Sequence, residues 1–173
     1  MMTETVVTVD PNRNPNPNPG QQPKPAGGAL SWLKFNIDYF TTIPGILKAV
    51  ELILGIICMA CASPAFISAT HYFLFVAVVS FIATLLWSFV YLLGIREVLN
   101  LTINWILTEM INTGIITLLY LIAFIVQLAS WSSLYGYGKG SNIAAGVFGL
   151  FNTLVYGFGT YLLFIEHKNS LSN

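Results

Sequence analysis

Four long apolar runs dominate the chain, and short polar stretches separate them. Each run has about 20 residues or slightly more, enough for a helix rising about 1.5 Å per residue to cross about 30 Å of hydrocarbon. The runs lack the alternation of barrel strands, and an open sheet cannot satisfy its edges in lipid. The pattern therefore predicts an all-α fold, a membrane-embedded four-helix bundle, with spans at roughly 43–63, 71–93, 103–128 and 143–165.

The N-terminal part differs in character from these runs. Residues 1–29 are polar and carry an Asn-Pro repeat, whose prolines block helix formation, so we expect a disordered tail. Trp32, Phe35 and Tyr39 then recur at helical spacing, which suits an aromatic segment at the headgroup level. The expected divisions are a disordered Pro/Asn-rich cytoplasmic tail at 1–29, an interfacial segment at 30–42, a four-span domain at 43–165 and a short cytoplasmic tail at 166–173.

Composition supports membrane embedding and excludes several classes of function. The chain is 55% hydrophobic and 8% charged, against about 25% charged in soluble domains, and its mean hydropathy is +0.73. A net charge of zero argues against nucleic-acid binding, which needs a clustered basic surface. Cys58 and Cys61 form a C-x-x-C pair without a basic neighbour, which favours packing over redox chemistry. With no catalytic triad or metal-ligand pattern, we expect no enzyme activity, cofactor or metal.

Basic residues in the flanks of the spans indicate the orientation. Short cytoplasmic loops carry an excess of Lys and Arg. An inside N-terminus leaves only Lys139 outside, so both termini are expected in the cytoplasm. This topology also places the sequon at Asn100 inside, where it stays unmodified. The basic residues on the cytoplasmic side are then Arg13, Lys24, Lys34, Lys48, Arg96 and Lys168.

Two carboxylates stand inside the predicted spans. Glu51 is about two turns into the first span and Glu109 about two turns into the third, so they lie at similar depth. A charged acid near the bilayer centre costs about 2.5–3.5 kcal/mol, so both should point into the bundle. Lys48, one turn before Glu51, either pairs with it or extends to the cytoplasmic surface.

Polar and small residues form stripes along the spans. The stripe on the third span has two readings: a polar path for an ion or proton, or a face that joins this helix to its neighbours by hydrogen bonds. Small residues on the other spans permit close approach within the bundle or in a homo-oligomer. The stripe on the third span comprises Thr102, Trp105, Glu109, Asn112, Thr113, Tyr120 and Gln127. The intramembrane positions singled out for polar contacts or packing are Lys48, Glu51, Gly55, Glu109, Asn112 and Gly149.

The start of the first span resembles the opening of a MARVEL domain. Residues 42–55 read TIPGILKAVELILG and follow a P-G-x-L-x-x-x-E-x-x-L-G-like pattern. Residues 144–156, continuing to Tyr161 and Phe164, are similar to that family's fourth helix. The resemblance covers about 38–168 and is strongest to chemokine-like-factor and plasmolipin-like members. Its motif positions are Pro44, Gly45, Glu51 and Gly55.

The resemblance implies a non-enzymatic protein of cholesterol-rich or closely apposed membranes. Such proteins act in vesicle traffic, in junctions, in membrane fusion or in stabilising partner membrane proteins. The expected partners are therefore membrane lipids, cholesterol-rich domains included, other membrane proteins and a second copy of the chain, at the plasma membrane or on endomembrane vesicles. The alternative is a small transporter or channel that uses Glu51 and Glu109.

Overall fold

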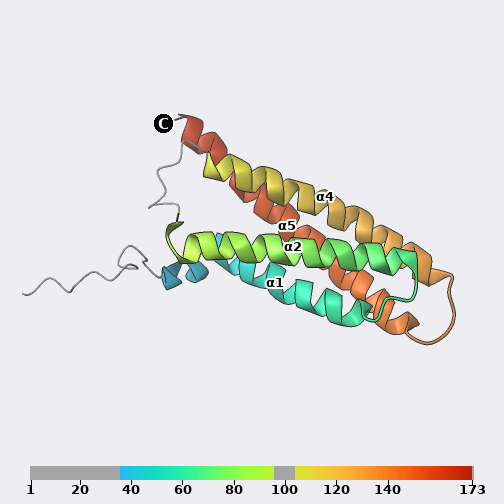
Figure 1. Ribbon diagram of the computed structural model, residues 1–173. Coiled ribbons are helices and arrows are strands. Elements are labelled where there is room, and N and C mark those ends of the chain that lie inside the picture. Colours follow the sequence, from blue (N-terminus) through green and yellow to red (C-terminus); the bar gives the residue numbers. More distant parts are fainter. Residues whose placement is uncertain (1–35, 96–103, 173) are drawn as a thin grey trace, which may run out of the picture. The chain divides into compact units, whose positions relative to one another are not determined.

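A computed structural model describes residues 36–95 and 104–172, and its regular elements are all helical. A short 3₁₀ helix, η1 (Ile37–Thr41), precedes four long α-helices. All four are long and apolar enough to cross a membrane. The all-α class and the four predicted spans are thus confirmed. The long helices are α1 (Ile43–Ala62), α2 (Ser68–Leu92), α4 (Trp105–Ser132) and α5 (Lys139–Ser172) (Figure 1).

The four helices form a closed ring of neighbours. Helix α2 packs between α1 and α4, and α5 packs against both α4 and α1. Helices α1 and α4 therefore lie on opposite sides of the bundle, separated by α2 and α5 (Figure 1). A side chain that joins α1 to α4 must cross the middle of the bundle.

The start of α1 is fixed by its capping residues. Thr42 has an extended backbone (φ −78°, ψ 157°), and its hydroxyl accepts a hydrogen bond from Gly45 N at 3.3 Å. Pro44 occupies the first turn, where its missing N–H costs nothing. A Cβ on Gly45 would lie 2.1 Å from the carbonyl oxygen of Tyr39. Glycine at this position therefore lets η1 lie directly on α1.

The helices extend past the predicted spans at several ends. Helix α4 runs four residues beyond 128, and α5 begins at Lys139 and continues through 166–172, the stretch expected to be a tail. Hydropathy marks the part of a helix that suits hydrocarbon, whereas backbone hydrogen bonding continues into the polar flanks. The connections at 63–67 and 133–138 are correspondingly short, and Gly136 and Gly138 adopt positive φ in the second one. Some predicted features lie outside the described residues. They are the N-terminal tail at 1–29, Lys34, Arg96, Asn100 and Thr102.

The core contains small and aromatic residues, whereas bulky aliphatic side chains face outward. The edge of Phe73 lies against Tyr120, with ring centroids 6.4 Å apart, and Tyr120 stacks on Tyr156 at 5.6 Å. Exposed large apolar side chains occur on all four long helices, which is the arrangement that lipid requires. The core cluster comprises Cys58, Ala62, Phe73, Val76, Ala77, Ile116, Tyr120, Ala123, Ala145 and Tyr156.

Candidate functional site

A cluster of three charged side chains occupies the interior of the bundle near the start of α1. The ammonium of Lys48 lies 3.1 Å from Glu109 Oε1 and 3.7 Å from Glu51 Oε2. The exposed fractions of Lys48, Glu51 and Glu109 are only 5%, 1% and 2%. Lys48 thus does not extend to the surface; it joins both carboxylates.

Helix geometry explains why these residues meet. Lys48 and Glu51 are one turn apart on α1, about 8 Å and 12 Å along the helix from Ile43. Glu109 is one turn into α4, whose N-terminus is held by Asn104, with its side chain accepting from Leu107 N at 3.1 Å. Glu109 is thus nearer to the start of its helix than the predicted two turns. Both acids nevertheless lie at a similar level, on opposite helices, because they contact the same ammonium. The long stem of Lys48 spans the distance between them.

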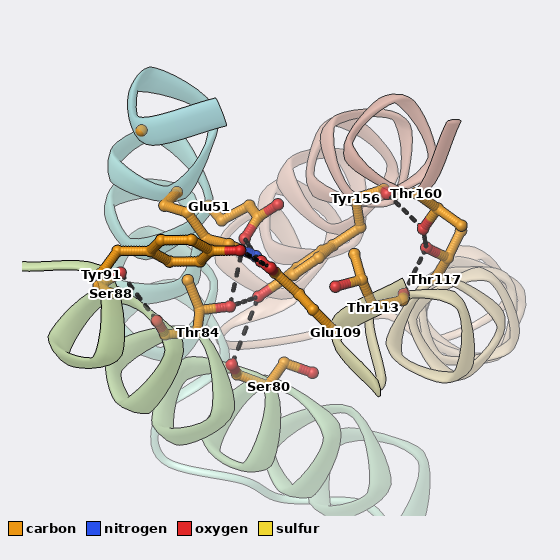
Figure 2. A network of polar contacts seen from close by, with 12 residues as sticks. Glu51, Ser80, Thr84, Ser88, Tyr91, Glu109, Thr113, Thr117, Tyr156 and Thr160 are labelled. Carbon is orange, nitrogen blue, oxygen red and sulfur yellow. Dashed lines mark hydrogen bonds and ion pairs between the residues drawn. The ribbon is translucent and has the colours of Figure 1, made fainter. Parts of the chain in front are cut away.

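Hydroxyl groups from α2 donate to one oxygen of each carboxylate (Figure 2). Thr84 donates to Glu51 Oε2 at 3.2 Å, and Tyr91 donates to Glu109 Oε2. The Tyr156 hydroxyl lies 2.8 Å from Thr84 Oγ1. The Tyr156 hydroxyl also donates to the carbonyl oxygen of Ser80 at 3.4 Å. Thr84 on α2 thus links the Glu51 carboxylate on α1 to Tyr156 on α5.

The three buried charges are stable in the bundle only as long as each keeps its partners. Two buried carboxylates and one ammonium are tolerated in a low-dielectric interior only when they neutralise and hydrogen-bond one another. Lys48, Glu51 and Glu109, with Thr84 and Tyr91, provide ion pairs and charge-assisted hydrogen bonds from three helices. Removing Lys48 leaves two buried carboxylates without a cation, and removing Thr84 or Tyr91 leaves a carboxylate oxygen without its hydroxyl donor. The cluster therefore ties the register of α1, α2 and α4 together.

A cavity of about 290 Å³ adjoins this cluster. Thr42, Pro44 and Glu166 are exposed residues of its lining, while Lys48, Glu51 and Glu109 are buried residues of the same lining. Glu51 Oε1 has no hydrogen-bond partner among the described residues. The remaining lining is Tyr39, Leu47, Tyr91, Gly159, Leu162 and Leu163.

A second polar cluster lies near the opposite end of the bundle. Trp131 Nε1 donates to Thr70 Oγ1 at 2.8 Å, and Thr70 donates to Gln127 Oε1 at 3.1 Å. The amide nitrogen of Gln127 donates to Asn142 Oδ1 at 3.0 Å. Gln127 is about 27 Å from Glu109 along α4, at about 1.5 Å per residue. This uncharged cluster joins α2, α4 and α5 by hydrogen bonds.

The core between the two polar clusters is mainly apolar and aromatic. Ile116, Tyr120 and Ala123 are the residues of α4 buried between Thr113 and Gln127. Each of the three is 4% exposed or less. Tyr120 belongs to the polar stripe predicted on the third span, but Ile116 and Ala123 flank it, so the stripe is sparse in its middle. This arrangement suits a role in joining the helices at each end of the bundle better than a path for an ion or proton along its length.

The other positions singled out from the sequence have different surroundings. Gly149 is buried where Phe73 and Phe124 pack, and Gly55 is buried beside Phe81. Asn112 is only half-buried, because the buried face of α4 turns toward Thr113 instead.

Cysteine and metal chemistry have no built site in the described part of the chain. Cys58 is fully buried and Cys61 is half-buried, and both are free thiols. The Sγ atom of Cys58 faces the carbonyl of Ala145 at 3.9 Å, a packing contact between α1 and α5. Among the described residues, no group of three His, Cys, Asp or Glu side chains could hold a metal ion.

Sequence reasoning did not place Thr84, Tyr91 and Tyr156 around the carboxylates. Helical spacing indicates which face of its helix each residue occupies. Their contacts depend on how α2 and α5 pack against the other helices. Asn152 was not singled out at all, although it is fully buried on α5. An amide inside an apolar span was the available signal.

Comparison with known proteins agrees with this architecture. Residues 39–162 match the family described as MARVEL, membrane-associating domain. The chain is 32% identical to mouse proteolipid protein 2 over 134 residues, covering 77% of this chain and 80% of that protein. It is 30% identical to bovine proteolipid protein 2 over 127 residues, covering 73% and 76%. No solved structure matches. The chain belongs to the MARVEL family of membrane-associating proteins and is an integral, multi-pass membrane protein.

Proposed function

We propose that this protein is a non-enzymatic organiser of membranes, acting in vesicle traffic or membrane apposition through lateral contacts with lipids and membrane proteins. The observation that carries the proposal is the distribution of its side chains. The side chains of the two polar clusters bind one another inside the bundle, and the connections at 63–67 and 133–138 are short. What residues 36–95 and 104–172 expose along the four long helices is an outer face rich in large apolar side chains.

That outer face offers shaped surfaces for lateral partners. On α5, Phe151, Leu154 and Phe158 are about half exposed and recur at helical spacing. A similar row on α4, also about half exposed and at helical spacing, consists of Ile111, Ile115 and Leu118. Without a hydrophobic drive between helices in lipid, such faces associate by shape and van der Waals contact. Cholesterol-rich lipid, other membrane proteins and a second copy of the chain are the proposed partners.

The proposed setting is the plasma membrane or endomembrane vesicles, with both termini in the cytoplasm. The basic residues of the sequence support this orientation, since only Lys139 then lies outside. The charged cluster and its cavity would consequently lie in the cytoplasmic half of the bilayer.

Co-purification tests the proposed role. The tagged full chain is solubilised mildly from cells, and its associated proteins and lipids are identified against a chain with Phe151→Leu and Phe158→Leu. Leucine keeps the α5 face apolar but changes its shape. The proposal expects enriched lipids or membrane proteins, some of which the variant loses. A monomer with no enriched partner or lipid argues against it.

A small transporter or channel is the second candidate, and one observation favours it. The cavity lined by Thr42 and Glu166 also reaches the carboxylates of Glu51 and Glu109. Flux of protons or small cations into liposomes that contain the purified chain tests this reading. Flux that Glu109→Gln abolishes supports transport, and absence of flux above empty liposomes removes it.

A further inference from the structure

Acidic groups outnumber basic groups in the buried part of the cavity lining. Among the described residues, that part contains two glutamates, Glu51 and Glu109, and one lysine, Lys48. Lys48 is already bound between Glu51 and Glu109. A positively charged occupant would offset the remaining negative charge, whereas an anion would be repelled.

One carboxylate oxygen requires a hydrogen-bond donor. Glu51 Oε2 accepts a hydrogen bond from Thr84 and faces the ammonium of Lys48 (Figure 2). Glu51 Oε1 has no hydrogen-bond partner among the described residues, and Glu51 is only 1% exposed. A Cβ added to Gly159, which lines the cavity, would lie 3.4 Å from this oxygen. Glycine thus leaves open space directly in front of an unpaired buried acceptor. A buried acceptor of this kind is costly unless a donor reaches it.

The walls indicate an amphiphile as the occupant. Pro44 and Leu47 of α1 and Leu162 of α5 provide apolar surface. Thr42, the cap of α1, is an exposed member of the lining and lies where this span begins, at the level of lipid headgroups. The volume of about 290 Å³ is near the lower end of ligand pockets, about 300–1,000 Å³, which suits a small head group.

We propose that this cavity binds the ammonium head of a membrane amphiphile, with Glu51 Oε1 as its acceptor and Pro44, Leu47 and Leu162 against its first methylenes. An ammonium supplies both the charge and the N–H donors. A long-chain amine and an aminophospholipid share this chemistry. This proposal names a class of lipid for the proposed lateral contacts, and it rests on the lipid-binding part of the proposed function.

Two glycine variants separate the site from general effects on α5. Gly159→Ala places a methyl group in front of Glu51 Oε1 without changing any charge. Gly157→Ala makes the same change two residues earlier, where the methyl group meets only Thr117 Cγ2 at 3.7 Å. Both changes replace glycine by a better helix former. Gly157→Ala is therefore the matched control, and Glu51→Gln tests the charge itself.

The full chain, purified in a neutral detergent, is titrated with hexadecylamine or with hexadecanol, and the bound fraction is measured by native mass spectrometry. The wild type and Gly157→Ala are expected to bind hexadecylamine more tightly than hexadecanol. Gly159→Ala and Glu51→Gln should bind the amine about tenfold to a hundredfold more weakly, as expected for the loss of one charge-assisted hydrogen bond.

Equal binding of amine and alcohol, or wild-type affinity in Gly159→Ala, would overturn the proposal. Parallel titrations with phosphatidylethanolamine and phosphatidylcholine distinguish the sources. Tighter binding of phosphatidylethanolamine than of phosphatidylcholine identifies the ligand as an aminophospholipid. Binding of hexadecylamine but of neither phospholipid identifies it as a free long-chain amine. Binding of neither the amine nor phosphatidylethanolamine overturns the proposal. The measurement uses no partner protein, so failure here and failure to find lateral partners in cells are distinguishable.

Discussion

Lys48 Nζ lies 3.1 Å from Glu109 Oε1 and thereby joins α1 to α4, which face each other diagonally across the bundle and do not pack side by side. The ion pair crosses the interior of the bundle, and Glu51 shares the same ammonium. A contact between diagonal helices constrains all four at once, because α2 and α5 must fit between them. The predictions below begin from this contact.

Replacing Lys48 by Met keeps the length of the side chain but removes its charge. Glu51 and Glu109 then face each other without a cation, and the free energy of unfolding should fall by about 3–5 kcal/mol. Thermal unfolding of the purified chain in detergent measures the loss. Lys168→Met, at an exposed position, should change it by less than about 0.5 kcal/mol. Equal melting of the two variants would show that the buried ion pairs contribute nothing.

The uncharged cluster at the other end should be less critical. Thr70→Val keeps the shape of the side chain but leaves Trp131 Nε1 without an acceptor and Gln127 Oε1 without a donor. Because hydrogen bonds between helices in membranes contribute about 0.6–2 kcal/mol, the expected loss of stability is of that size. The same unfolding assay measures it. A loss as large as that of Lys48→Met would contradict the ranking of the two clusters.

Close packing of α5 depends on Gly149. A Cβ there would lie 2.7 Å from Phe73 Cε2 and 3.2 Å from Phe124 Cβ, and Phe73 is fully buried against Tyr120. We expect Gly149→Ala to lower the free energy of unfolding by about 1–3 kcal/mol through overpacking. Gly140→Ala, with nothing within 4 Å of its Cβ, is the control and should be neutral or slightly stabilising. Unchanged melting of the Gly149 variant would refute this packing.

The apolar pattern was sufficient for the architecture. It gave four spans and an inward face for each, because lipid demands internal hydrogen bonding and places bulky apolar residues outside. It also predicted a similar depth for Glu51 and Glu109, and both contact the same ammonium, although Glu109 is one turn and not two turns into its helix. Helix ends were less predictable, as the extension of α5 to Ser172 shows.

The contacts within the site required the packing of the helices. Spacing brought Lys48 next to Glu51, because the two share one helix. It could not reveal that Lys48 lies closer to Glu109, since that distance depends on which helices are diagonal. The donors Thr84 and Tyr91 and the space before Gly159 depend on the same arrangement.

The proposed orientation can be tested by labelling single cysteines. In a chain with Cys58→Ala and Cys61→Ala, Tyr137→Cys puts a thiol in the connection at 133–138, where this residue is 94% exposed. Ser170→Cys puts one near the end of α5. A membrane-impermeant maleimide should label the first in intact cells and the second only after permeabilisation. The reverse pattern would invert the topology.

The central claim is that the outer face of the bundle is the working surface, and site-specific photo-cross-linking in cells tests it most directly. A photoreactive residue replaces one outward residue on each helix, namely Ile53, Phe75, Leu118 or Leu154, which are 57–62% exposed. The account predicts that at least one of the four positions yields discrete, recurring adducts with a membrane protein or a particular lipid. If all four positions yield only adducts with bulk lipid in proportion to its abundance, the claim is contradicted.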